Sequence, residues 1–302
     1  MLEFSRLGWK HKEQFNKVVK PYKYRNSESS FNNLYLWGES ENIEVAFGQH
    51  AMYLRFTLEE EKILYFTPFL YDISKPIKQA ISEIRHFLNR EEESFCIHGL
   101  IKEYKEKIEN EFDHFVFKES RNNFDYVYTS ESLINLSGKK LSSKRNHINY
   151  FLNNYEFEYK KYDASLRADC EALMASWSER QEDKLGIFDE SIAFAKIMDK
   201  FDQLDMKGAC IYVDGKLEAF TFGEALTDEL VLVHFEKANT DIRGLYPYIN
   251  QQFVKNEWAD YKYINREEDM GIEGLRKAKM SYKPEFFVEK YTCSLDGNCH
   301  DY

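Results

Sequence analysis

The fold is decided by the stretch D-E-L-V-L-V-H-F-E-K-A-N-T-D-I-R-G-L-Y-P-Y-I-N, which occupies residues 228–250. The segment at 230–236 is rich in aliphatic residues and long enough for a buried strand, and the polar segment at 239–244 ends on a glycine and predicts a turn. Leu245, Ile249 and Phe253 then recur every four residues, which predicts a helix. A strand, a glycine-bearing turn and a helix start form a common anion-binding unit, because the free amides of the first helical turn point outward.

The same alternation extends along the chain. After this unit we expect a short strand at 261–264, a charged loop and a helix at 270–280, and a last strand at 286–292. Earlier segments predict a helix at 28–37 capped by Ser29 or Ser30, an amphipathic helix at 77–88 and a strand at 95–98. Asp214 and Gly215 form a strong two-residue turn signal between strands at 208–213 and 217–222.

Length and element order indicate two domains. At 302 residues the chain is long for one domain, and its halves share an order of predicted elements with little residue identity. We therefore predict an α/β (α+β) protein with domains at 1–136 and 137–302, each a mixed, mostly antiparallel sheet flanked by helices. The first domain is predicted to be structural, because it lacks a pair of basic residues on the apolar side of a helix.

Charge and cysteine content restrict the partners and the compartment. A net charge of −11 disfavours non-specific binding to DNA or anionic lipid, so an anionic ligand needs a local basic pocket. The five cysteines are odd in number and scattered, which favours a reducing compartment. The sequence has no signal-peptide pattern and no apolar run of about 18 residues, so we expect a cytoplasmic protein without integral membrane contact. Cys293, Cys299 and His300 are interpreted as an exposed terminus, and no metal site is predicted.

Two predicted helices carry basic residues beside their apolar stripes. In the helix at 139–155, Leu141, Ile148, Leu152 and Tyr155 share one stripe, and Lys144 and Arg145 lie at its edges. In the helix at 270–280, Arg276 and Lys279 lie along the stripe marked by Ile272 and Leu275. Such cations need an anion when they are buried. They could also extend to water from the core rim, or pair with Glu267, Glu268 or Asp269.

Together with Arg243 in the turn, these residues support a ligand hypothesis. We expect Arg145, Arg243, Arg276 and Lys279 to line a pocket for a phosphorylated or otherwise anionic ligand. The dense basic patch around Lys144 could contact an RNA phosphate backbone, although a solvated helix face is the commoner outcome.

His234 and Glu236 are the candidate catalytic pair. They alternate with Val233 and Phe235, so they share one face of the predicted strand, roughly 6.5–7 Å apart. An imidazole and a carboxylate side by side could remove a proton from an amine nucleophile. They could equally form a structural hydrogen-bonded pair.

Several long motifs resemble a known bacterial family. They are G-K-K-L-S-S-K-R-N-H-I-N at 138–149, V-H-F-E-K-A at 233–238, R-G-L-Y-P-Y-I-N at 243–250 and N-R-E-E-D-M-G-I-E-G-L-R-K-A-K-M-S-Y-K-P at 265–284, with F-N-N-L-Y-L-W at 31–37 in the first half. The chain resembles proteins related to the C-terminal domain of phosphatidylglycerol lysyltransferase, whose architecture is similar to that of the Fem peptidyltransferases. The resemblance implies two tandem GNAT acyltransferase-like domains, with the active centre in the second.

The resemblance also implies a function. Proteins of this architecture transfer an aminoacyl group from a charged tRNA to an amine or hydroxyl, whereas ordinary GNAT enzymes use acetyl-CoA. The turn T-D-I-R-G-L-Y at 240–246 departs from the GNAT pattern R/Q-x-x-G-x-G/A, which favours a donor other than CoA. We therefore predict an acyl or aminoacyl transferase whose donor is aminoacyl-tRNA or acyl-CoA. The alternatives are a CoA-dependent N-acetyltransferase and a non-catalytic module that binds a nucleotide or the acceptor end of tRNA.

The predicted site residues lie within these motifs. His234 and Glu236 are the predicted catalytic residues, while the fourth-strand backbone would stabilise the oxyanion. The predicted substrate-binding residues are Lys144, Arg145, Asn146, His147, Arg243, Gly244, Asn265, Arg266, Arg276 and Lys279.

Overall fold

The computed structural model describes residues 2–57, 63–91, 93–179, 184–297 and 299. The chain forms two compact units: a first unit of residues 1–125, 268–271 and 288–302, and a second unit of residues 126–267 and 272–287. This division differs from a single boundary at 136/137. Residues 126–136 belong to the second unit because β8 (Asp125–Thr129) pairs with β13 (Tyr263–Asn265) in its sheet.

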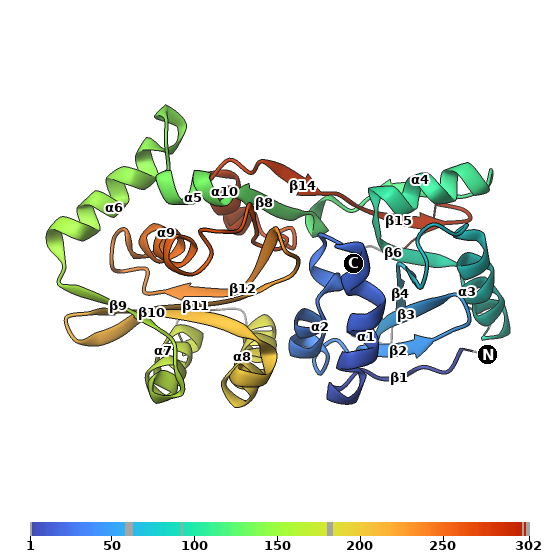
Figure 1. Cartoon of the computed structure of the whole chain (residues 1–302), viewed down its shortest axis with the longest axis horizontal. Helices are drawn as coiled ribbons and strands as arrows, with labels where there is room; N and C mark the ends of the chain where they lie inside the picture. The colour runs from blue at the N-terminus through green and yellow to red at the C-terminus, as the bar shows by residue number, and fades with distance from the viewer. Residues whose placement is uncertain (1, 58–62, 92, 180–183, 298, 300–302) are drawn as a thin grey trace. The chain divides into compact units, whose positions relative to one another are not determined.

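The second unit is a sheet with helices on both faces. Its strand order is β14-β8-β13-β12-β11-β10-β9, in which β12 and β13 are parallel and β8–β13, β9–β10, β10–β11 and β11–β12 are antiparallel. Figure 1 shows α9 on one face of this sheet and α7 and α8 on the other. The remaining bounds are α5 Ser130–Asn135, α6 Ser142–Asn154, β9 Phe157–Lys161, α7 Arg167–Glu179, α8 Lys184–Leu204, β10 Met206–Val213, β11 Lys216–Ala225, β12 Leu230–Ala238, α9 Leu245–Glu257, α10 Glu273–Met280 and β14 Phe286–Val288.

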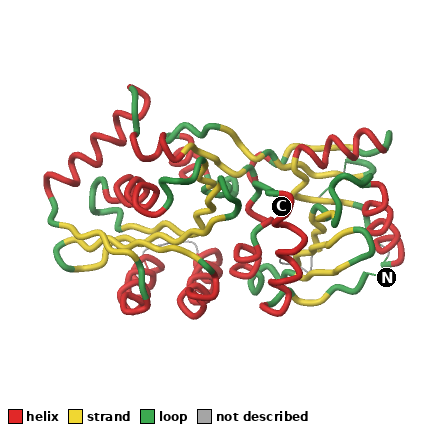
Figure 2. The backbone as a smooth tube through the Cα atoms, in the orientation of Figure 1, coloured by secondary structure: helices red, strands yellow, loops and turns green. Residues whose placement is uncertain are grey.

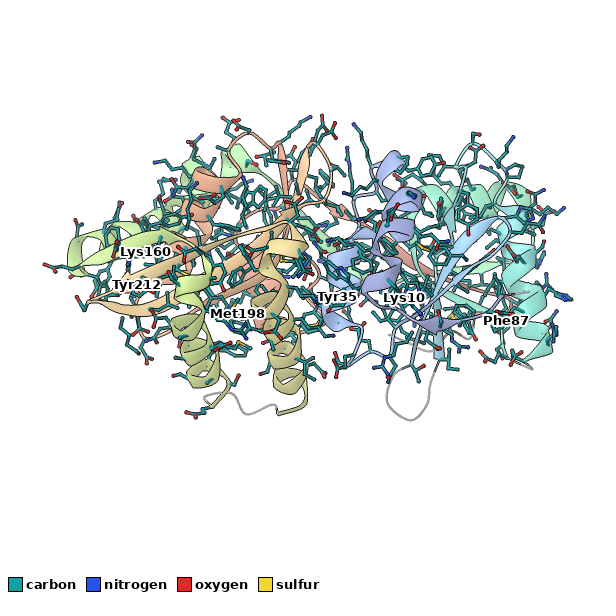
Figure 3. All side chains as sticks on the ribbon, turned by 60° about the horizontal axis from the view of Figure 1, so that its bottom comes forward. Lys10, Tyr35, Phe87, Lys160, Met198 and Tyr212 are labelled. Atoms are coloured by element: carbon teal, nitrogen blue, oxygen red, sulfur yellow. A yellow bond between two sulfur atoms is a disulfide. The ribbon has the colours of Figure 1, made fainter. Side chains whose placement is uncertain are left out.

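The β10–β11 hairpin confirms the turn predicted from Asp214 and Gly215 (Figure 2). Both residues have positive φ, 52° and 81°, as a tight primed turn requires. On the neighbouring edge, Lys160 lies over the ring of Tyr212, with 4.5 Å between its Nζ and the ring centroid (Figure 3). The hairpin is thus held by its turn and by side chains on the adjacent strands.

Strand β12 contains a bulge at His234. Phe235 pairs with Phe222 and Val233 pairs with Gly223, so His234 is the extra residue with no partner on β11. A bulge interrupts the ladder and redirects the side chains around it. The strand predicted at 230–236 therefore forms, and its irregular point lies at a predicted site residue.

Helix α9 begins where the glycine turn predicts. Leu245, Ile249 and Phe253 are all buried, which confirms the predicted stripe. Gly244 has φ of +92°, and a Cβ built on it would lie 2.1 Å from the carbonyl oxygen of His147 in α6. Only glycine permits this close approach of the two helices.

Two predicted helix stripes differ from the observed ones. In α6, Ile148 and Phe151 are buried, whereas Leu152 is 43% exposed, because the helix begins only at residue 142 and packs on α9 through the other face. Lys144 precedes Ile148 by four residues and so lies on the packed side. Ile272 is 52% exposed and caps α10 instead of marking its buried stripe, while Lys279 is the buried residue of that helix.

The first unit is also a mixed sheet with helices. Its strand order is β1-β2-β3-β4-β6-β15-β7, with β5 paired to β3, and only β4–β6 is parallel among the described pairs. The bounds are β1 Ser5–Arg6, α1 Lys12–Val19, α2 Phe31–Trp37, β2 Glu44–Phe47, β3 Ala51–Thr57, β4 Ile63–Phe66, β5 Phe69–Leu70, α3 Lys78–Arg90, β6 Cys96–Ile101, α4 Lys102–Glu111, β7 Val116–Glu119 and β15 Lys290–Ser294. Ser30 caps α2 by accepting a hydrogen bond from the Asn33 amide, which decides between the two predicted caps.

The strand predicted at 286–292 is in fact two strands in different sheets. β14 pairs with β8, whereas β15 lies between β6 and β7. Lys290 begins β15 and is 1% exposed, with its Nζ 2.7 Å from Glu28 and 2.8 Å from Asp125. This buried ion cluster fixes the returning chain within the first unit.

The expectation that Cys293 and Cys299 lie in an exposed terminus is wrong, because Cys293 is buried in β15 and Cys299 is bonded to Cys96. Cys96 and Cys299 form a disulfide, whereas Cys170, Cys210 and Cys293 are free and buried. The sequence separation of 203 residues concealed this pair. It forms because β15 runs beside β6 and brings the end of the chain back to Cys96.

Candidate functional site

Glu236 on β12 is held by two donors from separate elements. Its Oε1 accepts a hydrogen bond from Arg266 Nη2 at 2.8 Å, and its Oε2 accepts one from Asn250 Nδ2 at 2.9 Å. Arg266 directly follows β13, the parallel neighbour of β12, and Asn250 lies in α9. The Glu236 and Arg266 side chains are only 10% and 13% exposed. Charge-assisted hydrogen bonds in such a site are stronger than those between neutral groups.

Tyr282 lies beneath two cations. Its ring centroid is 5.0 Å from Arg266 Cζ and 4.0 Å from Lys144 Nζ. Burial, followed by repulsion from Arg266, lowers the pKa of Lys144 to about 8, against a smaller opposing effect of Glu236. The amine of Lys144 is therefore partly neutral near physiological pH. We call Lys144, Glu236, Asn250, Arg266 and Tyr282 the Glu236 cluster.

Neighbouring residues fix the position of Arg266. Lys279 Nζ donates to the Arg266 carbonyl at 2.6 Å, and the Lys279 carbonyl accepts a hydrogen bond from the Tyr128 hydroxyl at 2.8 Å. Asn265, which is fully buried, accepts a hydrogen bond from the Glu267 amide at 2.7 Å. Asn265 and Lys279 thus make hydrogen bonds to the backbone on either side of the Arg266 side chain's attachment point, at Arg266 and Glu267.

His234 is held between two carboxylates. Its Nδ1 is 3.0 Å from Glu267 Oε1 and its Nε2 is 3.0 Å from Glu224 Oε1, and its side chain is 0% exposed. Burial alone lowers the pKa of His234, but the hydrogen bonds to Glu224 and Glu267 overcome this effect and raise the pKa to about 9. An imidazolium with both nitrogens engaged has no lone pair for a proton at neutral pH. The geometry therefore favours the structural alternative for His234.

The other predicted basic residues make separate contacts. Arg145 donates to the carbonyls of Leu136 and Gly138, the latter at 2.8 Å, and so secures the segment that leads into α6. Arg243 lies over the ring of Tyr150 at 4.4 Å.

The remaining predicted residues lie on α6, the α9 turn and α10. His147 contributes its carbonyl to the contact with Gly244 in the turn. Asn146 is exposed, and Arg276 is half-buried in α10. The contacts that define the Glu236 cluster include only Lys144, Glu236 and Arg266 from the predicted site.

The acidic residues at 267–269 each contact a cation that was not part of the predicted basic pocket. Glu267 contacts His234, while Asp269 is 3.5 Å from Arg121 and Glu268 is 3.9 Å from Lys290. The sequence N-R-E-E-D thus distributes its charges over three different cations.

Sequence reasoning missed Asn250, Tyr282 and Glu224. Asn250 is 2% exposed, and its Oδ1 has no hydrogen-bonding partner among the residues that the structure describes. A buried acceptor of this kind is costly unless a ligand or water satisfies it. The available signal was a polar residue directly after Ile249 on a helix with a buried stripe. Tyr282 and Glu224 carried no comparable signal, since aromatic and acidic residues are abundant in the chain.

Comparisons with solved structures identify the class of fold. The chain has the fold of tandem GNAT-like proteins. It is 33% identical to a conserved protein of unknown function from Bacteroides thetaiotaomicron, with a TM-score of 0.88 over 98% of this chain and 100% of the other. L-PGS from Bacillus licheniformis is 14% identical, with a TM-score of 0.66 over 98% and 94% of the two chains. FemX is 9% identical, with a TM-score of 0.58 over 97% of each chain.

The chain belongs to the family described as phosphatidylglycerol lysyltransferase, C-terminal, whose model matches residues 19–294. This confirms the resemblance found in the sequence and makes the chain homologous to transferases. An uncharacterised protein, MYCGA3080 of Mycoplasmoides gallisepticum (strain R(low)), is 27% identical over 188 residues, which span 62% of this chain and 60% of that relative. None of the helices in the described part of the chain combines the length and apolar character needed to cross a membrane.

Proposed function

We propose that this protein transfers an aminoacyl group from a charged tRNA to an amine or hydroxyl acceptor. The observation that carries the proposal is the Glu236 cluster, in which two cations, a carboxylate and an unsatisfied buried amide oxygen meet at β12 of a GNAT-like unit. The family and the fold support aminoacyl transfer as the class of reaction.

The residues of the Glu236 cluster have separate roles in such a reaction. Lys144 and Arg266 place positive charge where phosphates of the donor's acceptor end would bind. Asn250 Oδ1 accepts a hydrogen bond from the attacking amine or hydroxyl, and Glu236 takes up the proton that the nucleophile loses. At the bulge, His234 has no partner on β11, so its backbone lies outside the ladder. We assign this backbone to the stabilisation of the oxyanion that develops on the attacked carbonyl of the donor. His234 acts as a positioning residue for this bulge.

The turn before α9 supports a donor other than CoA. In GNAT enzymes that use CoA, the amides of this turn hold the pyrophosphate. Here the backbone of α6 approaches Gly244 so closely that a single methyl group would collide with the His147 carbonyl. Helix α6 thus occupies space beside the turn and brings Lys144 to the cluster instead.

A transfer assay tests the proposal. The protein is incubated with tRNA charged with radiolabelled amino acids and a panel of primary amines and alcohols, and labelled acceptor is measured. Wild-type protein is expected to form labelled product. Lys144→Ala is expected to lower the rate about 10–100-fold, the loss associated with a hydrogen bond to a charged group.

The control is Lys140→Ala, which removes an exposed lysine just before the same helix. It should retain the wild-type rate. Equal rates for Lys144→Ala and wild type would remove the cluster from the reaction. Transfer of acetyl from acetyl-CoA without any aminoacyl transfer would replace the proposal with an N-acetyltransferase.

A further inference from the structure

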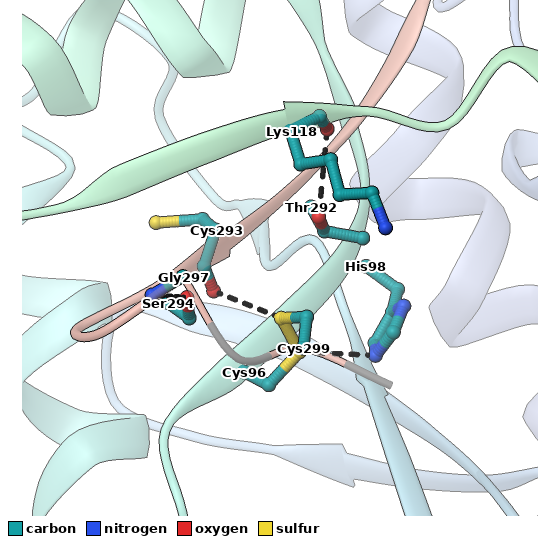
Figure 4. The surroundings of a disulfide bond; sticks show 8 residues. All are labelled: Cys96, His98, Lys118, Thr292, Cys293, Ser294, Gly297 and Cys299. Atoms are coloured by element: carbon teal, nitrogen blue, oxygen red, sulfur yellow. Dashed lines mark hydrogen bonds between the residues drawn. A yellow bond between two sulfur atoms is a disulfide. The ribbon is translucent and has the colours of Figure 1, made fainter. Parts of the chain in front are cut away.

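Two sulfurs and an imidazole meet in the first unit, whereas the residues of the Glu236 cluster belong to the second unit. Cys96 Sγ, Cys299 Sγ and a ring nitrogen of His98 all lie within 4.8 Å of one another (Figure 4). His98 Nε2 is 3.2 Å from Cys96 Sγ. Cys96 and Cys299 are half-buried and His98 is buried, so the group is sheltered but reachable by a small solute.

The sheet determines this arrangement. Cys96 and His98 are two residues apart on β6, so both side chains project from the same face. The His98 ring packs against Phe66, with 6.2 Å between the centroids, and the His98 carbonyl accepts a hydrogen bond from the Thr67 amide at 2.9 Å. β15 pairs with β6 and carries the chain onward to Cys299. Two of the three groups are therefore preorganised on one strand.

Two thiolates and an imidazole are a ligand set that Zn²⁺ prefers. Tetrahedral zinc with Zn–S bonds of about 2.3 Å separates two sulfur ligands by roughly 3.8 Å. Once the disulfide is reduced, the sulfurs of Cys96 and Cys299 need only a small movement apart to reach this separation. We propose that Cys96, His98 and Cys299 form a redox-gated zinc site, with water as the fourth ligand.

The disulfide-bonded form and the zinc-bound form exclude one another, because both use the sulfurs of Cys96 and Cys299. A thiol reductant supplies two electrons and two protons, which break the Cys96–Cys299 bond and leave two thiols, while the reductant becomes a disulfide. Zn²⁺ then binds both sulfurs as thiolates, and their two protons pass to solvent. In either state the end of the chain is linked to β6, through sulfur when oxidised and through zinc when reduced.

Cys293 provides a matched control. It belongs to β15 and is buried, but Figure 4 shows its side chain directed away from the disulfide. His300, interpreted from the sequence as part of the same terminal segment, lies outside the described residues. The metal ligands thus come from β6 and one terminal cysteine, not from the tail alone.

Cobalt titration tests the site, because Co²⁺ reports thiolate ligation by its sulfur-to-metal charge-transfer absorption. The full chain is reduced with a phosphine, which takes the oxygen of one water while the hydrogens go to the two thiols. Reduced wild type is expected to bind one Co²⁺ per chain with this absorption, to release it to Zn²⁺, and to lose binding when reoxidised. Cys96→Ser should lose most of the band, His98→Asn should bind Co²⁺ more weakly than wild type, and Cys293→Ser should keep the wild-type band and affinity.

A second measurement uses wild type alone, so it holds even if the substitutions prevent folding. In reduced wild type, Zn²⁺ should protect Cys96 and Cys299 from alkylation, as measured by mass spectrometry of peptides, and leave Cys293 unchanged. The proposal is overturned if reduced wild type shows neither the charge-transfer band nor this protection. It is also overturned if the oxidised protein binds the metal equally well.

Discussion

Replacing Gly244 with alanine tests the contact that brings α6 to the cluster. The new Cβ would lie 2.1 Å from the His147 carbonyl oxygen and 3.0 Å from the Phe151 Cβ. Neither neighbour can yield easily, because one is helix backbone and the other belongs to a fully buried side chain. Overpacking of this kind costs about 1–3 kcal/mol. The left-handed φ of +92° costs an L-residue about 1–2 kcal/mol more, which gives a total of about 2–5 kcal/mol.

Gly215→Ala separates the two contributions. Gly215 has φ of +81°, but nothing lies within 4 Å of a Cβ built there. This variant should lose only the conformational cost of about 1–2 kcal/mol. Urea unfolding followed by circular dichroism compares the midpoints, and Gly244→Ala should unfold at clearly lower urea. Equal midpoints would show that α6 does not press on the turn, and the reasoning that places Lys144 through this contact would fail.

Three further predictions address charge. Lys290→Met should destabilise the protein by about 3–5 kcal/mol in urea unfolding, because Glu28 and Asp125 lose their shared buried cation. A loss of stability below about 1 kcal/mol would contradict the buried ion cluster. The pKa of His234 is raised to about 9 from 6.5, so its stabilisation of about 3 kcal/mol is complete below pH 6.5 and disappears as pH rises through 9. His234→Gln should lack this pH dependence, and identical pH profiles would refute the paired imidazolium. The pKa of Lys144 is lowered to about 8, so the rate at which an amine-directed reagent labels it should rise with a midpoint near pH 8. Labelling only above about pH 10, as for an ordinary lysine, would contradict its burial beside Arg266.

The sequence predicted the local elements around the site well, because their signals are short-range. The strand at 230–236, the glycine turn and the α9 stripe depend on periodicity and on the backbone freedom of Gly244, and all three are confirmed. The inward placement of Lys144 was also predictable from helical spacing, even though Leu152 proved to be exposed.

Contacts between distant segments were not predictable in the same way. Sequence alternation placed His234 beside Glu236, but the bulge and the partners Glu224 and Glu267 decide its charge. The Cys96–Cys299 pair depends on β15 returning to β6, and a single predicted strand at 286–292 concealed that return. Each of these features depends on contacts between segments that are distant in sequence, and the spacing of residues along the chain does not reveal such contacts.

A thermal-shift titration with a non-hydrolysable aminoacyl-adenosine mimic of a charged tRNA end tests whether the Glu236 cluster binds an aminoacyl donor. Acetyl-CoA and free CoA serve as comparison ligands, and Lys144→Ala and Lys140→Ala as the variant and its control. A ligand at about 100 times its dissociation constant adds about 2.7 kcal/mol of stability, which corresponds to a shift of several degrees. We expect the mimic alone to stabilise wild type and Lys140→Ala, and Lys144→Ala to lose most of the shift. Stabilisation by CoA alone, or a shift of equal size in Lys144→Ala, would show that the Glu236 cluster does not bind an aminoacyl donor through Lys144.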